Sequence, residues 1–94
     1  MATKFSRMVA TKKEILTEAF IAIGYTKDRW GHLKRDAQSN DGKIRTYRIV
    51  FKPRVIRREV RCDDDWIMLA SATWKDAEVV DGKVKGFKRN TFLF

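Results

Sequence analysis

Residues 43–62 decide the fold and read KIRTYRIVFKPRVIRREVRC. Apolar side chains recur at alternate positions on both sides of Pro53, and this two-residue period is typical of half-buried β-strands. Proline cannot donate to a sheet ladder, so Pro53 marks a turn between strands. The segment therefore predicts two antiparallel strands, 43–52 and 54–62, joined by a short connection.

Positive charge is concentrated in this segment. It carries eight Lys or Arg against one acid, Glu59, and so supplies +7 of the chain's formal net charge of +9. The eight are Lys43, Arg45, Arg48, Lys52, Arg54, Arg57, Arg58 and Arg61. Guanidinium groups on paired strands repel one another unless an anion compensates them. The segment therefore predicts a polyanionic partner.

Alternation gives each strand of this pair a core face and an exposed face. The expected core face carries Tyr47, Ile49, Phe51, Ile56, Val60 and Cys62. The expected exposed face carries Thr46, Arg48, Arg57, Glu59 and Arg61. Arg58 breaks the pattern because it falls between two core positions, and Pro53 suggests a bulge that shifts the register.

A helix is expected upstream, over residues 12–23. Thr11 and Glu14 have the spacing of a capping box, and Gly24 stands where a left-handed C-terminal cap is typical. Apolar residues recur between these signals at intervals of three and four: Ile15, Leu16, Ala19, Phe20 and Ile23. Residues 1–10 are interpreted as a flexible arm.

The rest of the chain alternates in the manner of strands, at 29–36 and 65–74 and in a hairpin over 78–85 that turns at Asp81-Gly82. Short connections favour antiparallel neighbours. We therefore predict a single α+β domain, 1–94, with one N-terminal helix packed on an antiparallel β-sheet of about four to five strands in a meander. The apolar end, 91–94, is expected to dock as an edge strand or to bind a partner.

Signals for enzyme chemistry are weak. His32 is the only histidine, and we interpret it as a surface or half-buried residue, with an RNase that uses His32 as general base as an alternative. Residues 63–65 are three aspartates, but consecutive residues on an extended chain point alternately, so a turn explains them better than a magnesium site. Metal, phosphate-loop and dinucleotide motifs are missing from the sequence, so we expect no catalytic residue, metal or cofactor.

The compartment follows from cysteine usage. Cys62 is the only cysteine, so no internal disulfide can form, and we expect a buried thiol in a reducing compartment. No stretch approaches the roughly 18 apolar residues of a membrane span. The N-terminus lacks the apolar core of a secretory signal. A cytoplasmic protein without a membrane partner is expected.

Together these features predict a small, non-catalytic nucleic-acid-binding protein. RNA or single-stranded nucleic acid is preferred, because the single clear helix has balanced charges and does not resemble a groove-reading helix. The predicted binding residues are Lys43, Arg45, Arg48, Arg54, Arg57, Arg58 and Arg61, and the rings that are candidates to stack on bases are Trp30, Tyr47, Trp66 and Trp74. The alternative is a protein-binding inhibitor or assembly module whose basic sheet docks on an acidic partner, as in accessory proteins of phages and mobile elements.

Overall fold

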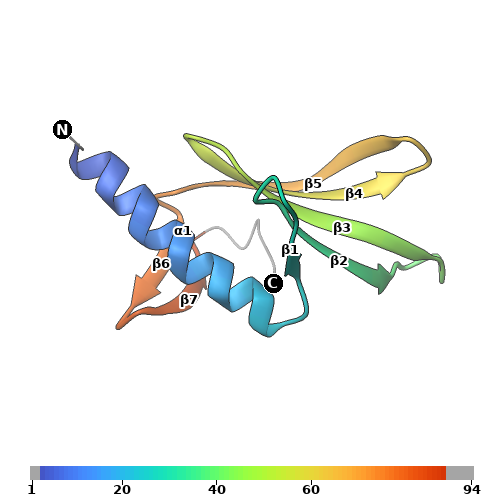
Figure 1. Cartoon of the computed structure of the whole chain (residues 1–94), viewed down its shortest axis with the longest axis horizontal. Helices are drawn as coiled ribbons and strands as arrows, with labels where there is room; N and C mark the ends of the chain where they lie inside the picture. Colours follow the sequence, from blue (N-terminus) through green and yellow to red (C-terminus); the bar gives the residue numbers. More distant parts are fainter. Residues whose placement is uncertain (1–2, 89–94) are drawn as a thin grey trace.

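A long helix lies across one end of a twisted antiparallel sheet (Figure 1). The computed structural model describes residues 3–88. The elements in chain order are α1 (Lys4–Ala22), β1 (Thr26–Lys27), β2 (Leu33–Gln38), β3 (Ile44–Phe51), β4 (Val55–Cys62), β5 (Asp65–Thr73), β6 (Ala77–Val80) and β7 (Lys83–Phe87). Strands β1 to β5 form one sheet in sequential order, and β6 pairs with β7 in a second, smaller sheet. The predicted α+β class and meander are confirmed.

The helix begins earlier than expected, and the interpretation of residues 4–10 as an arm is wrong. Thr3 is the N-cap, and its side chain accepts a hydrogen bond from the Ser6 amide at 3.1 Å. Met8 and Val9 pack against the core, so the apolar stripe continues upstream of the capping-box sequence. Thr11 therefore lies within the helix rather than at its start.

The helix ends close to the predicted place. Gly24 has a φ of 112°, and the Tyr25 amide donates back to the Phe20 carbonyl at 3.0 Å. The rings of Phe20 and Tyr25 meet edge to face with centroids 5.3 Å apart. This contact fixes the direction in which the chain leaves the helix.

Two strand predictions require correction. The strand expected at 29–36 is β2, which starts only at Leu33, because residues 28–31 form a turn. The hairpin over 78–85 is confirmed as β6 and β7, but it packs beside α1 as a separate sheet and does not extend the meander. The predicted edge strand at 91–94 lies outside the described residues. In the five-stranded sheet the register shifts between Arg58 and Glu59, not at Pro53.

The core sits where α1 meets the sheet and the small hairpin. The largest fully buried side chains are Trp74, Phe20, Leu16, Leu33, Ile49 and Ile56. Each contributes roughly 1.5–3 kcal/mol by leaving water. Ala77 and Phe87 join the same cluster and attach the hairpin to it.

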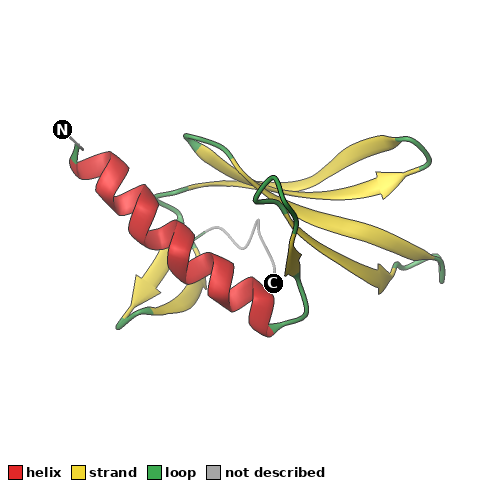
Figure 2. Ribbon diagram, viewed as in Figure 1, coloured by secondary structure: helices red, strands yellow, loops and turns green. Residues whose placement is uncertain are grey.

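Much of the sheet extends beyond the helix. The molecule measures 44 × 25 × 21 Å, and Figure 2 shows α1 at one end of the long strands while their other ends project past it. We call the projecting part the far half of the sheet. Its exposed apolar side chains are Ile44, Ile67, Met68 and Leu69. Neither face of this half is covered by the described helix.

Lys12 joins the helix to the turn after β5. Its ammonium donates to the carbonyl oxygens of Trp74 at 2.8 Å and Ala77 at 2.6 Å. Burial and the neighbouring Lys88 lower the pKa of Lys12, whereas Asp76 and Glu78 oppose that shift.

Replacing Lys12 by Met should destabilise the fold, because two carbonyls lose a charged donor. We expect a loss of about 1–3 kcal/mol in urea unfolding. Lys13→Met is the matched control, since the Lys13 ammonium only lies 5.8 Å above the Phe51 ring. Equal effects of the two substitutions would contradict the bridging role of Lys12.

Candidate nucleic-acid interface

The register of the sheet places basic residues on the face opposite α1, which we call the outer face. Lys34 lies across from Arg48, Arg48 from Glu59, and Arg61 from Trp66. Alternation puts Thr46 and Arg57 on the same side, as the sequence predicted. The outer face thus brings together cations from three neighbouring strands.

Trp66 lies at the centre of these cations. The guanidinium of Arg48 lies 4.0 Å from the ring centroid, that of Arg61 5.8 Å, and the ammonium of Lys34 6.0 Å. Such distances allow cation–π attraction. We call these four residues the Trp66 cluster.

Glu59 was expected to face solvent with its basic neighbours, and in the structure it is only 8% exposed. Its carboxylate accepts a hydrogen bond from Arg48 Nε at 2.7 Å. Direct cross-strand pairing explains the burial, because a carboxylate can leave water when a guanidinium compensates it. Arg48 is therefore a structural partner as well as a surface cation.

Arg57 and Arg61 remain without a carboxylate. Within residues 3–88 no acid lies within ion-pair distance of either one. Arg57 Nε is buried without a hydrogen-bond partner, and Arg61 Nε donates to the Asp63 carbonyl at 3.3 Å. These two guanidinium groups are the outer-face charges that can pair with an external anion.

Arg45 and Arg58 lie on the opposite face, on the far half of the sheet. Arg58 sits 5.3 Å from the Tyr47 ring centroid, and Arg45 pairs with Asp41 at 2.8 Å. With Arg35 they line an open concavity of about 700 Å³. Arg58 is tolerated between apolar positions because α1 does not extend over this half.

Cys62 lines the same concavity and is half-buried, not fully buried as expected. Its sulfur lies 3.6 Å from a guanidinium nitrogen of Arg45. The uncovered far half leaves the thiol within reach of solvent.

The other predicted residues divide between connections and core. Lys43 and Arg54 are exposed in loops. Trp74 is only 1% exposed and donates its indole N–H to the Lys52 carbonyl at 2.8 Å, so the prediction that its ring stacks on a base is wrong. Tyr47 and Trp66 are half-buried, with cations over their rings.

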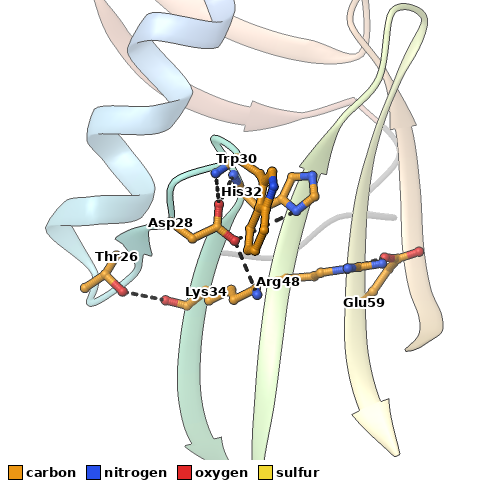
Figure 3. Close-up of polar contacts among 7 residues, drawn as sticks. All are labelled: Thr26, Asp28, Trp30, His32, Lys34, Arg48 and Glu59. Atoms are coloured by element: carbon orange, nitrogen blue, oxygen red, sulfur yellow. Dashed lines mark hydrogen bonds and ion pairs between the residues drawn. The ribbon is translucent and has the colours of Figure 1, made fainter. Parts of the chain in front are cut away.

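Trp30 is presented by a turn that Asp28 organises (Figure 3). Asp28 Oδ1 accepts hydrogen bonds from the amides of Trp30 and His32, both at 2.9 Å, and Lys34 Nζ lies 3.3 Å from Oδ2. Burial alone would raise the pKa of Asp28, but the His32 amide, the Lys34 ammonium and the Trp30 amide lower it overall. The turn leaves the Trp30 ring 67% exposed, with the Arg29 guanidinium 4.3 Å from its centroid.

His32 Nδ1 lies 4.0 Å from Asp28 Oδ2, which is beyond hydrogen-bond distance. A base-and-orienter arrangement needs a hydrogen bond between these two groups. The catalytic use of His32 stays a prediction.

Two searches within residues 3–88 bear on other functions. No group of three or more His, Cys, Asp or Glu side chains could hold a metal ion, and residues 63–64 form the β4–β5 turn. No helix in that range combines the length and apolar character needed to span a bilayer.

Sequence reasoning missed three contributors to the site. Lys34 belongs to the Trp66 cluster, Asp28 organises the Trp30 turn, and Phe5 lines a cleft near the start of α1. Alternation along the predicted strand 29–36 gives the face on which Lys34 lies. Only the register between this strand and the next shows that Lys34 lies opposite Arg48. Nothing in the local sequence marks Phe5.

Comparison with known proteins gave no match: no family model fits the chain, and neither a curated protein nor a solved structure is significantly similar to it.

Removing the Glu59 carboxylate should leave the half-buried Arg48 uncompensated. Glu59→Ala should destabilise the fold by about 1–3 kcal/mol, the range for hydrogen bonds to charged groups, in chemical unfolding. Asp64→Ala removes an exposed acid from the adjacent turn and should change stability by less than about 0.5 kcal/mol. If Glu59→Ala is as mild as this control, the ion pair does not organise the outer face.

Lowering the pH should destabilise the loop in which Asp41 pairs with Arg45. The Ser39 hydroxyl, Arg45 and the Lys43 amide hold the pKa of Asp41 well below its usual value. A carboxylate with a depressed folded pKa stabilises the fold above its unfolded pKa of about 3.9, and that contribution is lost as the pH falls further. The difference in thermal midpoint between the wild type and Asp41→Asn should therefore shrink between about pH 5 and pH 2. A constant difference would show that the charge of Asp41 contributes nothing.

Proposed function

We propose that this protein binds nucleic acid without catalysis through its outer face, with RNA or another single strand preferred. The observation that carries the proposal is the Trp66 cluster, in which three cations surround one indole ring, on the same face of the sheet as the uncompensated Arg57. A lone thiol and a nucleic-acid partner both fit a cytoplasmic protein.

Phosphate pairing provides the affinity in this proposal. A guanidinium can hold a phosphate with two parallel hydrogen bonds, and each neutralised phosphate releases condensed counterions. Arg57 and Arg61 have no carboxylate competitor within residues 3–88.

The preference for single strands follows from shape. A basic sheet with exposed or half-exposed rings offers platforms for unstacked bases, either on the indole or on a stacked guanidinium. The helix α1 instead packs its apolar side into the core through Leu16 and Phe20. Helix insertion into a duplex groove is therefore not favoured.

A second candidate is a protein-binding module that docks on an acidic partner. It is favoured by the exposed apolar side chains of the far half, Ile44, Ile67, Met68 and Leu69. Direct binding separates the two candidates, because a nucleic-acid binder takes labelled oligonucleotides of many sequences, whereas a specific protein-binding module needs its one partner.

Neutralising Arg57 and Arg61 should weaken RNA binding selectively. For the variant Arg57→Gln with Arg61→Gln, we expect the log–log salt slope of binding to a labelled single-stranded RNA to fall by about 1.4, or 0.7 for each phosphate lost. Affinity at low salt should fall about tenfold or more. Fluorescence anisotropy at several salt concentrations measures both quantities.

The control variant carries Lys83→Gln and Lys85→Gln on the separate hairpin. It has the same change in net charge and should retain most of the salt slope. Equal losses in the two variants would mean that total charge, not the outer face, governs binding. RNA should also be recovered intact after incubation; cleavage that is lost in His32→Ala would instead support the RNase alternative.

A further inference from the structure

A cleft lies near the start of α1, at the opposite end of the strands from the far half. Three segments distant in sequence meet there: the first turn of α1, the β3–β4 connection and the turn after β5 (Figure 1). The cleft is open to solvent, has a volume of about 420 Å³ and is lined by Phe5, Arg54, Thr73, Trp74 and Lys75. This volume falls within the roughly 300–1,000 Å³ of small-molecule sites.

The apolar part of the cleft is aromatic. The Phe5 ring is 43% exposed on the first turn of the helix, so its surface is available to a ligand. Trp74 also lines the cleft but is only 1% exposed, because its indole N–H is bonded to the Lys52 carbonyl and its ring packs against Phe51 with centroids 5.5 Å apart. Phe5 is therefore the ring that a flat apolar group can contact.

Cations surround this aromatic part. Arg54 and Lys75 belong to the lining and are exposed. Lys12 donates to the Trp74 carbonyl, and the Lys13 ammonium lies 5.8 Å from the Phe51 ring. No ion pair within residues 3–88 occupies any of these four side chains.

Acidic groups near the cleft are few and already engaged. Asp76 accepts a hydrogen bond from the Thr73 amide, and Glu78 lies 4.0 Å from the Lys85 ammonium. The rim of the cleft is therefore net positive. A neutral apolar ligand would contact the Phe5 ring but leave the cations unpaired. A base with flanking phosphates would contact the ring and pair with the cations.

We propose that this cleft binds one unstacked base of a single-stranded nucleic acid, with the adjoining phosphates on Arg54 and Lys75. The inference rests on the proposed function and deepens it, since it names an unpaired nucleotide as the recognised unit. A base within a duplex is stacked and paired on both sides and cannot enter the cleft without being flipped out.

The test compares a labelled oligouridylate with the same backbone carrying abasic sites. Phe5→Leu retains an apolar side chain on the helix and removes the ring, and Phe5→Ala removes more of the side chain. Ile21→Ala is the matched control, because Ile21 is similarly exposed, at 47%, near the other end of α1. Circular dichroism verifies that each variant is folded.

The wild type and Ile21→Ala should prefer the natural oligomer at least about fivefold more strongly than the Phe5 variants do, the lower end for stacking of one base on an aromatic ring. The affinity of the Phe5 variants for the abasic backbone should stay unchanged, and stacking on the outer face accounts for any preference that these variants retain. Arg54→Gln should weaken binding of both oligomers by about two- to fivefold, through lost phosphate pairing.

Two results would overturn the inference in different ways. If the wild type binds both oligomers equally, or if the Phe5 variants keep the preference, nucleic-acid binding stands but the cleft takes no base. The cleft would then be assigned to a side chain of a protein partner. If neither oligomer binds even at low salt, the proposed function fails and the inference falls with it.

Discussion

The burial of Trp74 is the constraint on which the rest of the structure depends. Its indole N–H is held by the Lys52 carbonyl, its own carbonyl receives the Lys12 ammonium, and its ring packs against Phe51. One residue thus connects the β3–β4 turn, the helix and the chain leading to the small hairpin. Because these contacts fix the helix at one end of the sheet, the far half and the outer face remain uncovered and available to a partner.

The charge of the basic segment is divided between structure and surface. Arg45 and Arg48 are neutralised by Asp41 and Glu59, so they organise a loop and a strand pair instead of simply repelling their neighbours. Arg57 has no such partner within residues 3–88. This division explains how a strand pair rich in arginine can fold, since part of its charge is compensated within the fold.

The spacing of apolar residues predicted the strand pair and the helix, because both spacings depend only on residues close together in the sequence. The true helix start was missed because its extension depends on the Thr3 cap and on tertiary packing of Met8. The burial of Glu59 required the cross-strand register, which alternation does not give. Trp74 is a candidate stacking ring by sequence but is buried in the structure, because a strand pattern does not show where the chain turns into the core.

The proposal that a single-stranded nucleic acid lies on the outer face can be tested by NMR. Titration of unlabelled RNA into isotope-labelled protein tests the ligand and its location together. We expect shifts in the Trp66 indole N–H and in the Nε–H groups of Arg57 and Arg61, with little change in β6 and β7. Unchanged spectra at low salt, or shifts confined to that hairpin, would contradict the proposal.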